Sequence, residues 1–132
     1  MKIKFKLLLK ISSGMLFVLS ACAGLQQQVA VSSVDGEKVI TMEASSFKFT
    51  PNNIKAYQGD SVVIRIMNIS EAGHDFTIKD PQGQTIQSVD LPSKKMVEIR
   101  VSLPEPGEYS FYCDKPLHSS FGMKGQIEVL RK

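Results

Sequence analysis

The stretch "FYCDKPLHSSFGMKG" (residues 111–125) brings a cysteine, a histidine and a methionine close together in the chain. Four residues separate Cys113 from His118, and four more separate His118 from Met123. Cys113 is the only cysteine outside the N-terminal region, and His118 is one of two histidines among 132 residues. Thiolate, imidazole and thioether groups all bind metal ions. The segment is therefore either a metal-binding loop or an ordinary loop with a buried thiol.

A fourth donor is the other histidine, His74, which follows the turn sequence "SEAG" and opens a segment that alternates like a strand. Two imidazoles, one thiolate and one thioether form the ligand set of a blue-copper site, with a weak axial methionine. Thioether sulfur is a poor ligand for zinc, magnesium or calcium. Met123 therefore favours copper. The alternative is that each of these side chains has only a structural role.

The elements that must position these side chains are short strands. Several segments alternate apolar and polar residues with period 2, which is typical of half-buried strands. Each of these segments is predicted to form a strand. These are residues 61–68, 74–79, 96–103, 107–113 and 125–131, with weaker candidates at 39–44 and 53–58. Turn sequences rich in Gly, Pro and Asp separate them. Seven to eight strands with no helical stripe predict an all-β, Greek-key β-sandwich.

This arrangement places the candidate ligands at strand ends. Cys113 ends one predicted strand, and the next begins just after Met123, so His118 and Met123 lie on the connecting loop. If the turn before His74 lies at the same end of the sandwich, His74 can reach the same point. The strand pattern therefore allows the four donors to converge.

The N-terminus reads as an export signal. Four lysines precede an apolar run that is about half the roughly 20 residues needed to span a bilayer. "LSAC" (residues 19–22) resembles the lipobox of bacterial lipoproteins, which implies cleavage before Cys22 and lipid on its sulfur. Several acyl chains together would anchor the protein firmly to a membrane. We expect the protein at the periplasmic or extracytoplasmic face of a membrane. The alternative is an ordinary signal with a chance cysteine.

The predicted organisation has three parts. Residues 1–21 are a lipoprotein signal peptide, residues 22–38 are the lipidated cysteine and a flexible tether, and residues 39–132 are the folded domain. If Cys22 carries lipid, Cys113 has no disulfide partner, and a lone thiol in an oxidising compartment calls for burial or a bound metal. The alternative pairing is a Cys22–Cys113 disulfide.

The net charge of +3 comes from 16 basic and 13 acidic residues, and four lysines leave with the signal. The mature chain then has 12 basic and 13 acidic residues, for a net charge of −1. A mature chain without a basic stripe is not expected to bind nucleic acid.

Residues 39–132 resemble a cupredoxin of the plastocyanin/azurin type. "SFKFTPNNIKAYQGDSVVIRIMN" (residues 46–68) resembles the family's opening hairpin. "GHDF" resembles the segment with its first copper ligand and points to His74, and "YCDKPLHSSFGMKG" resembles its ligand loop and points to Cys113, His118 and Met123. The resemblance implies one type 1 copper ion, Cu(I)/Cu(II), as the cofactor. Asp75 and Asp114 stand where the family often has Asn and Ser or Thr. Their charge predicts a lowered reduction potential.

The resemblance implies a membrane-tethered one-electron carrier, which we expect to be a monomer and not an enzyme, because the four donors leave no open position for a substrate. Transient redox partners, a cytochrome or an oxidase, would dock near His118, Leu117 and Phe121, between Lys115 and Lys124. The alternatives are a copper chaperone or storage module of the cell envelope, or a metal-free adhesion sandwich. The mature chain lacks the Met-rich or His-rich segments that favour the chaperone.

Overall fold

The computed structural model describes residues 29–30, 32–34 and 37–132. The predicted signal peptide and the lipid site at Cys22, which is also one cysteine of the alternative disulfide, lie outside these residues. Strand pairing starts earlier than the predicted domain boundary at residue 39, because β1 (Val29–Ala30), β2 (Ser32–Val34) and the first residues of β3 (Glu37–Ser45) belong to the sheets. Within the described residues, none of the secondary structure is a helix of the length and apolarity that a bilayer crossing needs.

The described chain is all strands and loops, as the alternation predicts. The strands after β3 are β4 (Lys48–Thr50), β5 (Asn53–Tyr57), β6 (Asp60–Asn68), β7 (His74–Lys79), β8 (Thr85–Leu91), β9 (Met96–Leu103), β10 (Gly107–Tyr112) and β11 (Lys124–Leu130). Eight of the strands have five or more residues. The predicted all-β sandwich is confirmed. The sequence pattern did not predict β1, β2, β4 and β8.

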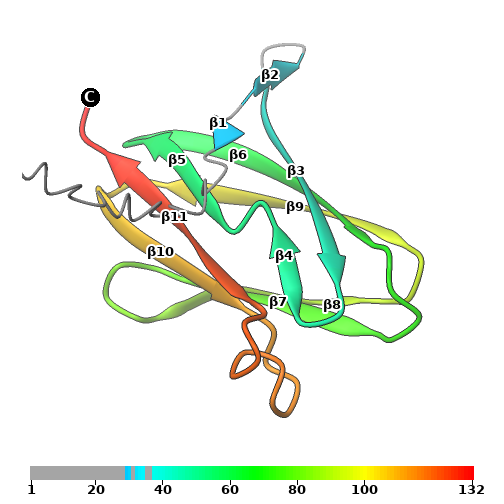
Figure 1. Cartoon of the computed structure of the whole chain (residues 1–132). Coiled ribbons are helices and arrows are strands. Elements are labelled where there is room, and N and C mark those ends of the chain that lie inside the picture. The colour runs from blue at the N-terminus through cyan, green and yellow to red at the C-terminus, as the bar shows by residue number, and fades with distance from the viewer. Residues whose placement is uncertain (1–28, 31, 35–36) are drawn as a thin grey trace, which may run out of the picture.

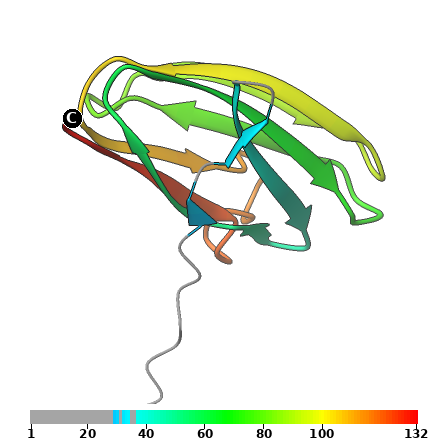
Figure 2. The same ribbon diagram turned by 90° about the horizontal axis from the view of Figure 1, so that it is seen from above.

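Two mixed sheets form the sandwich. One has the order β1-β5-β11-β10-β7-β8, and the other has the order β2-β3-β6-β9, with β4 paired to β3. The chain crosses between the sheets several times, for example from β5 to β6 and from β6 to β7. The parallel pairs β3 with β6 and β5 with β11 therefore join strands that are not consecutive in the chain. Figure 2 shows the two layers from above, with β10 and β11 on one side and β6 and β9 on the other. Figure 1 shows the loop between β10 and β11 extending beyond the sheets.

The core lies between the sheets and follows the alternation. In β9, Ile99, Val101 and Leu103 are buried, whereas Glu98 and Arg100 point to solvent. Such one-sided burial follows from the pleat of a strand, whose side chains alternate between the two faces.

An aromatic cluster lies in the core next to the ends of β7 and β10. The rings of Phe76 and Phe111 stack with centroids 5.1 Å apart, and Phe49 meets both edge to face at 5.6 and 5.7 Å. All three side chains are almost completely buried. Burial of each stabilises the fold by about 2 kcal/mol relative to exposure. The cluster gives the adjacent strand ends a rigid support.

A buried carboxylate closes the other end of the sandwich. Asp60 is 5% exposed and accepts hydrogen bonds from Tyr57 N at 3.0 Å, Lys38 Nζ at 2.5 Å and Lys132 Nζ at 3.2 Å. Burial alone would raise the pKa of Asp60, but the bonds from Lys38, Tyr57 and Lys132 outweigh it and hold the pKa below its ordinary value of 3.8. The ionised form of Asp60 therefore stabilises the folded state.

The Asp60→Asn variant is expected to lower the free energy of unfolding by about 2 kcal/mol at neutral pH, because it removes charge-assisted hydrogen bonds. The folded-state pKa is lowered, so this contribution is present above the unfolded-state pKa and disappears as the pH falls through the folded-state pKa. Urea unfolding at several pH values would show the difference from wild type shrinking below about pH 4. The exposed Asp90→Asn is the control, and a difference that is constant with pH would contradict this role of Asp60.

Candidate metal centre

The alternation of β7 and β10 directs two of the predicted ligands inward. His74 shares a face with the core residue Phe76, and Cys113 continues the face of Phe111 just beyond the end of β10. The two strands are antiparallel neighbours, with Tyr112 opposite Thr77, so the end of β10 meets the start of β7. His74 and Cys113 are therefore both buried at the same end of the sandwich, where they extend the aromatic cluster of the core.

Backbone hydrogen bonds close the loop between β10 and β11 on itself. Cys113 N donates to Met123 O at 3.0 Å, and Met123 N donates to His118 O at 3.0 Å. A further bond, from His118 N to Lys115 O at 3.1 Å, turns the chain back toward Cys113. These bonds hold the backbone of Cys113, His118 and Met123 together, as the spacing of the three residues suggested.

Three donor atoms converge at this point. Nδ1 of His118 lies 3.2 Å from Nδ1 of His74 and 3.4 Å from Sγ of Cys113. One ligand atom from each of these three side chains lies within 4.8 Å of the other two, which is a separation that one ion can bridge. The structure thus brings together the two histidines and the cysteine. Met123 is fully buried in the core cluster beside them, and its backbone bonds both to Cys113 and to His118.

The buried setting shapes the protonation of the donors. Burial raises the pKa of the Cys113 thiol above its ordinary value, and the charge of Asp75 adds to the rise. Burial lowers the pKa of His74, and the nearby His118 and Lys115 lower it further. A neutral imidazole is the form that binds metal ions, and a bound cation favours the thiolate over the thiol.

Asp75 connects the start of β7 to the ligand loop. Its Oδ1 accepts a hydrogen bond from Asp114 N at 2.6 Å, next to Cys113. The aspartate at this position thus accepts an N–H of the ligand loop. The bond ties the segment of His74 to the segment of Cys113 and brings a negative charge close to both.

Two contacts of the histidines were not predicted. Oγ of Ser70 lies 2.8 Å from Nε2 of His74, and the ring of Phe47 meets the ring of His118 edge to face with centroids 4.9 Å apart. Ser70 belongs to the turn before β7, and Phe47 lies in the turn between β3 and β4 with φ of +57°. Neither residue is part of a periodic pattern, so the only available signal was its place in a turn.

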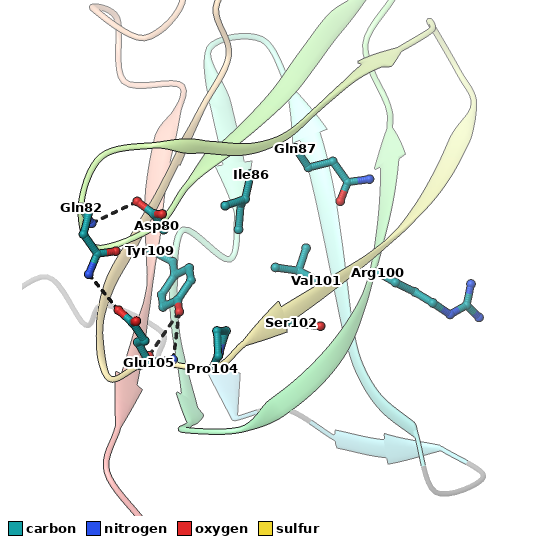
Figure 3. Close-up of a pocket in the computed structure, with 10 residues that line it drawn as sticks. All are labelled: Asp80, Gln82, Ile86, Gln87, Arg100, Val101, Ser102, Pro104, Glu105 and Tyr109. Atoms are coloured by element: carbon teal, nitrogen blue, oxygen red, sulfur yellow. Dashed lines mark hydrogen bonds between the residues drawn. The ribbon is translucent and has the colours of Figure 1, made fainter.

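A pocket of about 330 Å³ lies at the opposite end of β7 and β10 and contains none of the candidate ligands (Figure 3). Its polar groups pair with one another: Gln82 Nε2 donates to Glu105 Oε2 at 2.8 Å, and the hydroxyl of Tyr109 donates to Glu105 O at 3.2 Å. The clustered metal donors therefore lie in the ligand loop and the start of β7, away from this pocket.

The donor set fits copper. Two imidazoles and one thiolate match the trigonal plane of a blue-copper site, and a buried methionine beside them matches its weak axial ligand. A structural zinc site prefers more thiolates, and magnesium and calcium prefer oxygen ligands. The cofactor that this site suits is a single type 1 copper ion.

Comparison with known proteins agrees with a donor set that fits copper. Residues 11–129 match the model of the cupredoxin-like domain. The chain is 29% identical over 94 residues to the major chloroplastic plastocyanin isoform of Arabidopsis thaliana, covering 64% of this chain and 53% of the plastocyanin. It is 23% identical over 124 residues to the chloroplastic plastocyanin of Silene latifolia subsp. alba, covering 88% of this chain and 71% of that plastocyanin. The chain thus spans about half the length of the Arabidopsis relative.

Solved structures share the fold. Reduced auracyanin from Roseiflexus castenholzii superposes with a TM-score of 0.61 at 19% identity, over 69% of this chain and 95% of auracyanin. The metal-binding domain of the Cu(I)-exporting ATPase CopA from Streptococcus pneumoniae superposes with a TM-score of 0.63 at 19% identity, over 81% of this chain and 99% of that domain. The family match covers most of the chain and agrees with the two-sheet architecture, and it shows that this protein belongs to the cupredoxin-like domain family.

Proposed function

We propose that the protein is a one-electron carrier whose copper ion is held by His74, Cys113, His118 and Met123. The observation that carries the proposal is the convergence of two imidazoles and a thiol within 4.8 Å at one end of a rigid sandwich. A bound copper ion supplies a centre that alternates between Cu(I) and Cu(II). Four protein donors leave no position for a substrate, which supports a carrier over an enzyme.

The scaffold suits electron transfer because it keeps the donors in place. His74 and Cys113 project from paired strands, and the bond from Asp114 N to Asp75 Oδ1 joins their segments. Residues held in this way move little when the charge at the site changes. His118 is the more exposed of the two histidines, whereas His74 is 2% exposed. The imidazole of His118 is therefore the proposed path for electrons to and from the surface.

Titration of the purified, metal-free protein with Cu(II) tests the proposal. A type 1 site would give an intense blue or green colour and a narrow copper hyperfine splitting in the electron paramagnetic resonance spectrum. One equivalent of copper should saturate both signals. Weakly coloured, easily removed copper would instead support a copper chaperone or storage module, and no binding at all would refute both functions.

An apolar rim of exposed side chains lies beside His118. It consists of Phe47, Leu117 and Phe121, which are 41%, 65% and 64% exposed. Phe47 contacts both His118 and Phe121, with ring centroids 4.9 and 5.2 Å apart. Large apolar side chains that gather around a metal ligand in this way favour a small, transient contact with a redox partner. We propose that a cytochrome or an oxidase docks on this rim.

Electron self-exchange between reduced and oxidised copies tests the rim without a known partner. Leu117→Lys should slow self-exchange, measured by NMR line broadening, about tenfold, which corresponds to about 1.4 kcal/mol of docking free energy. The visible spectrum of the copper site should stay unchanged because Leu117 is not a ligand. Ile86→Lys, in the pocket at the other end, is the matched control. Equal rates for Leu117→Lys and wild type would rule out docking at the rim.

We further propose that the protein is exported and anchored to the outer face of a bacterial membrane through lipid on Cys22. The support is the sequence alone, a basic and apolar N-terminus that ends in "LSAC". In cell fractionation the wild-type protein should stay with the membrane, and Cys22→Ser should release it. A wild-type protein found wholly in the soluble fraction would contradict the anchor.

A further inference from the structure

The turn that leads into β7 is organised by Asn68, the last residue of β6. Asn68 is fully buried, and its Nδ2 donates to Ala72 O and to Leu91 O, both at 2.9 Å. Its Oδ1 accepts hydrogen bonds from Ser70 N at 3.0 Å and Ser70 Oγ at 2.7 Å. The two carbonyl partners of Nδ2 determine the orientation of the amide, so Oδ1 can only be an acceptor toward Ser70.

The hydroxyl of Ser70 has three polar neighbours and one proton. Its Oγ lies 2.7 Å from Asn68 Oδ1, 2.8 Å from Ala72 O and 2.8 Å from His74 Nε2. The two oxygens are acceptors, so the proton of the hydroxyl points toward them. The contact between Ser70 Oγ and His74 Nε2 then needs a proton from the imidazole. Nε2 of His74 therefore carries the proton and donates it to Ser70 Oγ, and Nδ1 is left with its lone pair.

We infer that Ser70 is a positioning residue, which holds His74 in the Nε2–H tautomer with Nδ1 directed at the other donors. Nδ1 of His74 does lie next to Nδ1 of His118, at 3.2 Å. The partner of the second ring nitrogen commonly sets the orientation and tautomer of a metal-binding histidine. The role of Ser70 in metal binding rests on the proposed copper site. The tautomer of His74 itself exists without metal.

The position of Ser70 is itself supported from outside the turn. Ser93 Oγ donates to Ser70 O at 2.9 Å, and Lys94 Nζ donates to Ile69 O at 2.7 Å. Both donors come from the segment between β8 and β9, which also accepts a bond from Asn68 N at Lys95 O. Ser93 provides a matched control, because its hydroxyl bonds to the same turn but not to the imidazole.

The first test is NMR of the metal-free protein with ¹⁵N-labelled histidine at neutral pH. Wild type, Ser93→Ala and Ser70→Thr, which keeps the hydroxyl, should all show His74 protonated at Nε2 alone. Ser70→Ala should show a mixture of the two tautomers. The inference is overturned if wild type carries the proton on Nδ1, or if Ser70→Ala keeps the same single tautomer as Ser93→Ala.

The second test uses the copper-loaded protein. Ser70→Ala should lower the affinity for Cu(II) about tenfold or more, as loss of a partner of a metal-binding histidine does, and Ser93→Ala should not. A tenfold loss for Cu(II) alone raises the reduction potential by about 59 mV. If wild type binds no copper, the proposed function fails while the NMR result still decides the role of Ser70. If wild type gives a type 1 spectrum and Ser70→Ala matches its affinity and potential, the inference fails alone.

Discussion

Replacing Cys113 with serine is expected to abolish the intense visible colour of the copper-loaded protein. In a site of this type the colour arises from charge transfer between the thiolate sulfur and the copper ion, and a serine oxygen cannot supply it. Cys113 Sγ lies 3.4 Å from Nδ1 of His118 and is the only sulfur among the three clustered donors. Absorption spectroscopy after addition of Cu(II) measures the loss directly.

The fold of this variant should survive. Serine is close to cysteine in size, and placing a hydroxyl in the fully buried position costs about 1 to 3 kcal/mol unless it finds a hydrogen-bond partner. Circular dichroism should therefore show the same β structure in Cys113→Ser and wild type. A folded serine variant that kept the intense colour would show that another residue supplies the sulfur, and the assignment of Cys113 would be wrong.

Replacing Gly125 with alanine is expected to be the most damaging small change outside the ligands. An added Cβ would lie 2.3 Å from Asn52 O and 2.5 Å from Cζ of Phe111. Asn52 O is backbone and already accepts a bond from Gln126 N, and Phe111 is packed in the aromatic cluster. Since neither neighbour can move freely, β11 must shift. We expect a loss of about 3 kcal/mol in the free energy of unfolding, measured by urea denaturation.

The same shift would reach the metal centre, because Gly125 follows Met123 by two residues at the end of the ligand loop. The copper-loaded variant should therefore also show a changed visible spectrum. Gly73→Ala is the control, since its Cβ would meet only Leu91 O, at 3.9 Å, which is an ordinary contact. A Gly125→Ala protein within about 0.5 kcal/mol of wild type would contradict the crowding at this position.

The strands that alternate could be predicted from the sequence, and β8 could not. In β9 every second residue is apolar and faces the core, so the period alone identifies the strand. In β8 the apolar residues Ile86, Val89 and Leu91 are unevenly spaced, and only Leu91 is fully buried. β8 is an edge strand that pairs only with β7 within its sheet. Its strand state therefore depends on this pairing and not on its own pattern.

The candidate site likewise has residues that the sequence predicts and contacts that it does not predict. Cys113, His118 and Met123 could be proposed because rare residue types fall at short spacing, and His74 because it starts a strand. That the start of β7 meets the end of β10 depends on which strands become neighbours in the sheet, and the alternation within one strand does not encode this. Ser70 lies in a turn, and its hydrogen bond to His74 depends on how Asn68 shapes that turn. Such a contact needs three-dimensional structure.

X-ray absorption at the copper edge tests most directly whether one ion joins these donors. The fine structure of the Cu(II)-loaded protein is expected to show one short copper–sulfur bond and two copper–imidazole nitrogen bonds, with a weak, longer sulfur contribution from Met123. A first shell made only of nitrogen and oxygen atoms, or one that contains a single imidazole, would contradict the convergence of His74, Cys113 and His118 on one copper ion.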